Sequence, residues 1–166
     1  MTPAELITRN LKAAIENAGA TLPVQSLLLE ALDGEKLQTP SSGIALLVHI
    51  AGQLEEPLPH YSFNVRAILT VSLDDDKGGQ LFKTNYETLW SVFDNLARAD
   101  NCTALGDDES SATPLAAGES SDTPLAAGFF VDGFQLGEGD EPDFQQDENG
   151  GVFTTTFAAT ITGRAY

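Results

Sequence analysis

The clearest pattern in the chain is a run of alternating residues between positions 61 and 73. Apolar side chains occupy one side of this run and polar side chains the other, and only Ile68 breaks the alternation. A period of two is typical of a strand with one buried face. The sequence therefore predicts a long strand over Tyr61–Leu73. Its buried face would be formed by Tyr61, Phe63, Val65, Ala67, Leu69, Val71 and Leu73.

A second pattern, with helical spacing, follows this strand after an acidic turn. Large apolar side chains recur at short intervals that place them on one wide face of a helix. They are Phe82, Tyr86, Leu89, Trp90, Phe93, Leu96 and Ala97. Because such helices usually cover a sheet, we expect Trp90 and its neighbours to pack on the buried face of the Tyr61–Leu73 strand.

The beginning of the sequence predicts another helix. Thr2 and Glu5 have the spacing of a capping box, and Pro3 occupies the first helical position. Gly19 is a natural end for this helix. Its apolar stripe consists of Ile7, Leu11, Ala14, Ile15 and Ala18.

Two segments ahead of the long strand have weaker patterns. Residues 24–32 fit either a short helix or a buried strand, and we favour a strand or a short irregular segment. Residues 44–51 are apolar on both sides, which predicts a strand inside the sheet, antiparallel to Tyr61–Leu73. His49 in this strand is interpreted as a core or interface histidine.

Two further strands are predicted in the last third of the sequence. Phe129–Leu136 is apolar, with a possible bulge at Gly133. From residue 152 to residue 161, one side carries large and small apolar groups, whereas the other is rich in threonine. A threonine-rich side suits a lightly polar interface or solvent.

These elements predict an α+β fold in which an antiparallel or mixed sheet of about four to five strands is covered by two main helices. The 166 residues fit a single domain, 1–166, that can bury a core without disulfides or metals.

The segment ESSATPLAAG at Glu109–Gly118 is repeated at once as ESSDTPLAAG at Glu119–Gly128. We interpret this repeat as a tandem duplication within a flexible insertion at about 103–128. Residues 137–151 are expected to form an acidic loop.

No arrangement of residues indicates catalysis. The two histidines, His49 and His60, stand in no nucleophile context, and the single cysteine, Cys102, permits neither an internal disulfide nor a thiolate zinc cluster. The sequence thus predicts no enzyme, no cofactor and no metal. One free cysteine suits a reducing compartment, and neither a signal peptide nor a membrane-spanning segment is indicated.

The charge of the chain restricts its partners. Eight Lys and Arg residues stand against 25 Asp and Glu residues, which gives a formal net charge of −17. Repulsion of this size opposes contact with nucleic-acid phosphates and anionic lipid, so we expect no sequence-specific nucleic-acid binding and no membrane binding.

The order of elements resembles the tail terminator proteins of long-tailed bacteriophages. The resemblance rests on the helix FKTNYETLWSVFDNLA after a long strand and on a last strand ending in TFAATITGRAY. It implies a structural virion protein of the tail or neck, without enzymatic activity, that is assembled in the host cytoplasm. Members of this family form a ring, usually a hexamer, on the end of the tail tube. The ring stops tube growth and provides the surface that the head-side connector meets.

In such a ring, acidic groups are expected to face the passage of the DNA, so that the polyanion does not bind. The candidate lumen-facing or partner-facing acids are Asp74, Asp75, Asp76, Glu138, Asp140, Glu141 and Asp143. Arg66, on the polar side of the long strand, is the candidate for pairing with a carboxylate of a neighbouring subunit. The alternatives are an acidic inhibitor that imitates DNA, another tail or neck subunit, and a small enzyme with an unrecognised site.

Overall fold

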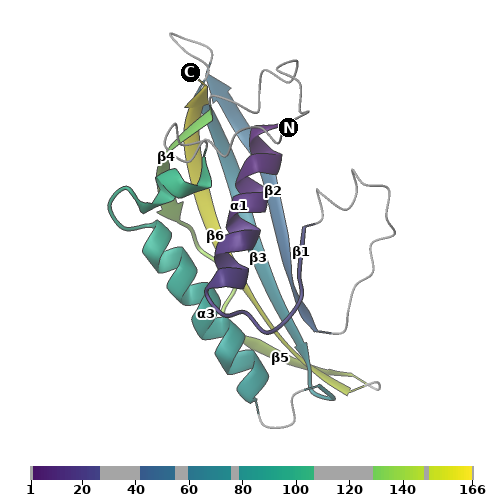
Figure 1. Ribbon diagram of the computed structural model, residues 1–166. Helices are drawn as coiled ribbons and strands as arrows, with labels where there is room; N and C mark the ends of the chain where they lie inside the picture. The colour runs from purple at the N-terminus through teal and green to yellow at the C-terminus, as the bar shows by residue number, and fades with distance from the viewer. Residues whose placement is uncertain are drawn as a thin grey trace, which may run out of the picture.

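The computed structural model describes residues 2–26, 42–54, 60–75, 79–106, 129–147 and 150–165, which form a sheet with helices on one side (Figure 1). Asp76 and the duplicated segment at 109–128 lie outside the described residues. In chain order the elements are α1 (Pro3–Asn17), β1 (Val24–Ser26), β2 (Gly43–Leu54), β3 (His60–Ser72), α3 (Gln80–Leu96), the 3-10 helix η1 (Asn101–Leu105), β4 (Phe129–Leu136), β5 (Asp143–Asp147) and β6 (Gly150–Ala165).

The sheet of the described residues is mixed and has six strands. Its order is β1-β2-β3-β6-β4, and β5 pairs with the first part of β6. β1 runs parallel to β2, whereas every other pairing is antiparallel. The predicted α+β class with two main helices is therefore confirmed. The predicted antiparallel pairing of β2 and β3 is confirmed as well.

The long central strand has the buried face that its alternation predicts. In β3, Phe63, Val65, Ala67, Leu69 and Val71 are at most 2% exposed, whereas Asn64 and Arg66 between them are exposed. Helix α1 packs on this side of the sheet with Ile7, Leu11 and Ile15, all completely buried. The core therefore lies between one face of the sheet and the two helices.

The predicted capping box at the start of α1 is present. The Glu5 backbone N–H donates to Thr2 Oγ1 over 3.2 Å, and the Thr2 N–H donates to Glu5 Oε2 over 3.3 Å. Two of the N–H groups that lack partners inside the helix are satisfied in this way.

Helix α3 covers the sheet, but the predicted burial of Trp90 is wrong. Leu89 and Phe93 are buried, whereas the Trp90 side chain is 54% exposed. Successive residues of a helix are rotated by about 100°, so Trp90 lies beside Leu89 on the flank of the helix. The helix packs on β6 in addition to β3. Its Phe82 ring lies 5.5 Å, centre to centre, from the ring of Phe153 in β6.

Two expectations about strands need correction. β2 lies inside the sheet, between β1 and β3, but only one of its faces is buried, so its apolar residues on the other side are not core. The acidic segment 137–151 is not a loop throughout, because β5 and the start of β6 form a hairpin there. Phe144 stabilises this hairpin with its ring 4.7 Å from that of Phe153.

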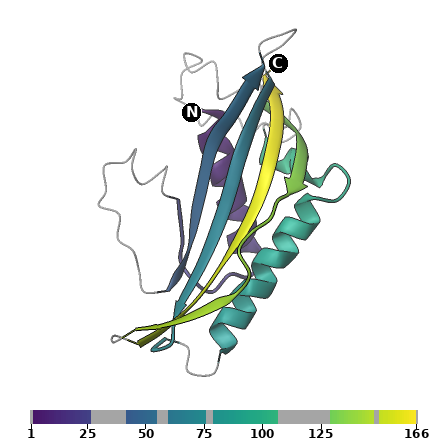
Figure 2. The same cartoon turned by 180° about the vertical axis from the view of Figure 1, so that it is seen from behind.

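The second face of the sheet is not covered by any described helix. Seen from behind, β2, β3 and β6 lie side by side in front of both helices (Figure 2). We call this surface the open face. Within the described residues, no helix is long and apolar enough to cross a membrane.

Candidate functional site

The open face is centred on Arg66. In the register of the sheet, Leu47 of β2 and Ala158 of β6 pair with Arg66 on its two sides. Because directly paired residues point to the same side of a sheet, all three side chains lie on the open face. Arg66 is exposed, and it makes no ion pair with any described residue.

The neighbouring rows of the open face are apolar on one side of Arg66 and polar on the other. Ile68, the residue that breaks the alternation of β3, pairs with Ala45 and Thr156. Ile68 and Ala45 therefore form a small apolar area on the open face. On the other side, Asn64 pairs with His49 and Thr160. His49 is exposed, so the structure excludes it from the core and leaves the interface interpretation.

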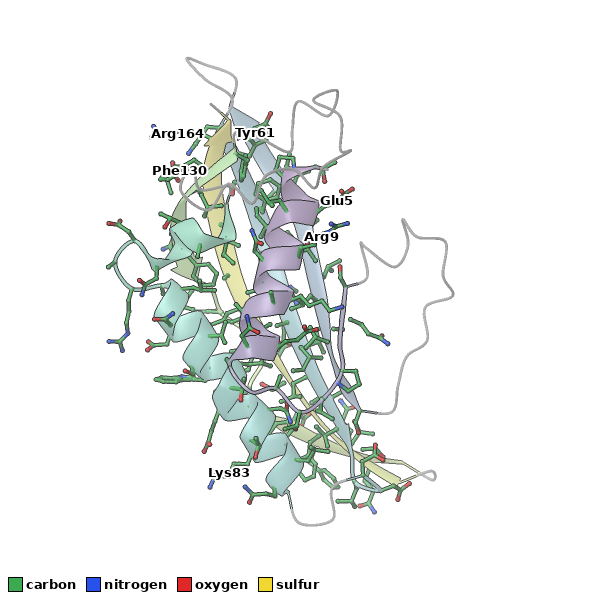
Figure 3. The ribbon with its side chains drawn as sticks, viewed as in Figure 1. Glu5, Arg9, Tyr61, Lys83, Phe130 and Arg164 are labelled. Atoms are coloured by element: carbon green, nitrogen blue, oxygen red, sulfur yellow. The ribbon has the colours of Figure 1, made fainter. Side chains whose placement is uncertain are left out.

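One end of the open face is held by a small polar cluster. Thr162 Oγ1 donates to Asp132 Oδ1 over 2.9 Å, and His60 Nε2 lies 3.4 Å from Asp132 Oδ2. Arg164 lies with its guanidinium 5.5 Å from the centre of the Phe130 ring. Figure 3 shows Arg164 and Phe130 together at this end of the sheet.

The charge of the open face differs from that of the chain. β2, β3 and β6 contain none of the 25 Asp and Glu residues, although these are the three longest strands. Their charged residues are Arg66 and Arg164. In a chain with a net charge of −17, the centre of the open face is thus free of carboxylates and carries positive charge.

The predicted acids lie elsewhere, in two places. Asp74 and Asp75 follow the end of β3, where the Asp75 carboxylate accepts a hydrogen bond from Ser42 Oγ. The same hydroxyl accepts from the Ser72 N–H over 2.9 Å, so part of this acidic turn stabilises the contact between the β2 and β3 ends.

The other four acids follow the outer edge of the sheet. Glu138, Asp140 and Glu141 lie on the segment between β4 and β5, and Asp143 is the first residue of β5; all four are exposed. The structure therefore does not bring these acids and Arg66 into one cluster. Arg66 lies on β3, on the far side of β6 from this edge.

Neither a cluster of metal-ligating side chains nor a reactive cysteine is found among the described residues. No group of three or more His, Cys, Asp or Glu side chains among them is placed to hold a metal ion. Cys102 is buried, and this burial raises the pKa of its thiol, which keeps the sulfur protonated and a poor nucleophile.

No protein-family model matches the chain, and no curated protein matches it. The fold and the site define an α+β protein whose sheet is covered by helices on one face and whose second face is free of carboxylates along its three central strands β2, β3 and β6. Sequence reasoning found Arg66 from the strand alternation. It missed the open side of β2, because Ala45 and Leu47 have the apolar character of core residues.

Proposed function

We propose that the protein is a structural subunit that assembles with copies of itself, and that the assembly is a ring of the kind formed by phage tail terminators. In this role the ring caps the end of a tail tube in the virion and provides the surface for the head-side connector. The proposal rests on one observation above all. Arg66 is exposed, makes no ion pair with any described residue, and lies at the centre of the three strands β2, β3 and β6, which contain no carboxylates.

The charge distribution supports self-assembly through this face. Copies that each carry −17 repel one another, and this repulsion is weakest where a contact surface has no carboxylates. An arginine there can pair with a carboxylate of the next copy, and such complementarity fixes the orientation of a contact. The exposed acids of the sheet edge then remain free to face the passage of the DNA.

Replacing Arg66 tests the proposal. We expect Arg66→Ala to weaken self-association roughly tenfold or more, because it removes the interfacial cation, while the free energy of unfolding changes by less than about 0.5 kcal/mol. Association would be measured by sedimentation with and without tail tubes, and folding by urea denaturation. Lys12→Ala is the control, since Lys12 forms a surface pair with Glu16 on α1.

Three results would contradict the proposal. They are equal losses of assembly and folding in Arg66→Ala, no loss of assembly, and a wild-type protein that stays monomeric even with tail tubes. Competition with DNA for a nucleic-acid enzyme would favour the alternative of a DNA-imitating inhibitor.

A further inference from the structure

A second surface feature lies at the sheet edge, away from Arg66. It is a hollow of about 190 Å³, open to solvent, between helix α3 and the segment that joins β4 to β5. Trp90 and Phe93 of α3, Leu136 of β4 and Phe157 of β6 are the large apolar residues that line it, and of these Phe93 is buried. Figure 2 shows the joining segment running along β6 beside α3. We call this feature the Trp90 hollow.

The walls of the Trp90 hollow are apolar and accessible. Trp90 is 54% exposed and Leu136 is 50% exposed, whereas most large apolar side chains of the described chain are buried. A half-exposed tryptophan beside an apolar depression is typical of a contact that a partner completes, since tryptophan is enriched at the centre of interfaces.

Two glycines of the joining segment lie close to the backbone of β6 beside the hollow. Gly137 and Gly139 both line it. The Gly137 N–H donates to the Ala158 carbonyl over 2.8 Å, and a Cβ added at Gly139 would lie 1.9 Å from the Thr156 carbonyl oxygen. The segment therefore lies flat against β6.

The joining segment beside the hollow, which we call its rim, carries acidic residues whose side chains lie outside the lining itself. Glu138 stands between the two glycines, Asp140 and Glu141 follow, and all three side chains are exposed. Asp94 lines the hollow, but Arg98 neutralises it through an ion pair of 2.8 Å. The net charge of the rim thus comes from the three acids of the joining segment.

We propose that the Trp90 hollow binds a basic segment of a different protein. An apolar side chain of that segment enters between Trp90 and Leu136, and Lys or Arg residues on either side of it face Glu138 and Asp140. A second copy of this chain is a poor occupant, because it has only eight Lys and Arg residues among 166. The contact does not use Arg66 or the open face, so it can be tested without the self-association proposed above.

The protein carries a built-in reporter for this contact, because Trp90 is its single tryptophan. The probe is a nine-residue peptide with one leucine between arginines on a Gly/Ser background. We expect a saturable blue shift of the Trp90 emission, as the leucine displaces water from the indole. A peptide with glycine in place of the leucine, and another with glutamates in place of the arginines, should bind at least about tenfold more weakly.

Variants assign the binding to the hollow. Leu136→Gln removes one apolar wall, and the pair Glu138→Gln with Asp140→Asn removes rim charge. Each should weaken binding of the basic peptide roughly threefold to tenfold. Glu16→Gln on the exposed side of α1 is the matched control for lost charge and should bind as wild type does. Circular dichroism of each variant establishes that it is folded.

Four outcomes would overturn the proposal. They are no saturable shift up to about 1 mM peptide, equal binding of the acidic peptide, unchanged binding by the double rim variant, and a shift of the Trp90 emission with protein concentration alone. The last result would show that a second copy fills the hollow. The first three readouts do not depend on ring assembly, and the concentration series is read in Arg66→Ala, in which ring assembly is expected to be weakened, so this contact is tested separately from the proposed function.

Discussion

At the scale of single residues, the best-defined polar contact is a completely buried amide. Asn85 of α3 accepts hydrogen bonds from the backbone N–H groups of Thr21 and Leu22 at 3.0 and 3.3 Å. Its Nδ2 group donates to Thr21 Oγ1 and to the Leu81 carbonyl. One side chain thus connects α3 to the segment between α1 and β1. Every polar atom of that side chain is satisfied within the protein.

We expect Asn85→Ala to lower the free energy of unfolding by about 2–4 kcal/mol. The truncation removes a completely buried amide that makes four hydrogen bonds, and it leaves the part-buried N–H groups of Thr21 and Leu22 without their acceptor, where an unsatisfied group costs about 1–3 kcal/mol when it is shielded from water. Urea denaturation measures the loss. Asn64→Ala on the open face is the matched control and should change stability by less than about 0.5 kcal/mol, because Asn64 is exposed. Similar losses in both variants would refute the role given to Asn85.

At the scale of elements, the segment between β4 and β5 depends on close backbone contact with β6. The Asp140 carbonyl accepts from the Thr156 N–H over 3.2 Å and from Thr155 Oγ1 over 2.8 Å. Gly139 lies against the Thr156 carbonyl oxygen with no room for a side chain. A stretch that carries three exposed acids is therefore held in place by its backbone.

Gly139→Ala should destabilise the protein by about 1–3 kcal/mol, because the added methyl group would force the segment away from β6. Thermal unfolding measures the change. Gly52→Ala provides the comparison, since a Cβ at Gly52 would meet no atom within 4 Å and the backbone there is not left-handed. If the two variants lose the same stability, the contact of Gly139 with β6 is not what holds the segment.

Most elements were predictable because their patterns are long. The capping box and stripe of α1, the alternation of β3 and the bulge near Gly133 in β4 all have local signals in the sequence. β5 was missed because five residues among acids carry little periodicity. Its pairing with β6 and the stacking of Phe144 decide its structure, and both are contacts with a later part of the chain.

The candidate site was predictable only in part, for a related reason. The polar side of β3 identified Arg66, but the sequence does not say which sheet face the helices cover. That choice follows from the packing of α1 and α3 together. The exposure of Trp90 depends in the same way on how α3 sits over β6, because a wide apolar stripe on a helix does not reveal which of its edges stays outside.

At the scale of the whole molecule, the acids and the longest strands are separated. Among the described residues, carboxylates lie in the helices, in β4, in the segment 137–147 and in the turns after β3 and α3, whereas β2, β3 and β6 have none. The net charge of −17 acts against the compact state by self-repulsion, and salt reduces this repulsion.

Raising NaCl from about 20 mM to about 500 mM should therefore raise the melting temperature by at least about 2–4 °C, which corresponds to about 1 kcal/mol for a chain of this length. Calorimetry measures the shift. A variant with Glu138→Gln, Asp140→Asn and Glu141→Gln should respond less to salt, because it has less charge to screen. A melting temperature that falls with salt, or an equal response of the two proteins, would contradict this prediction.

The position of β6 at the end of the sequence affects how the protein folds during its synthesis on the ribosome. β6 pairs with β3, β4 and β5. These three strands therefore lack a pairing partner until β6, which follows all of them in the sequence, has been synthesised. β3 in particular leaves the ribosome with one edge unpaired until β6 follows, nearly a hundred residues later. Pairings this distant in sequence form slowly. The nascent chain therefore spends much of its synthesis with an exposed strand edge, where its strong negative charge helps to keep neighbouring chains apart.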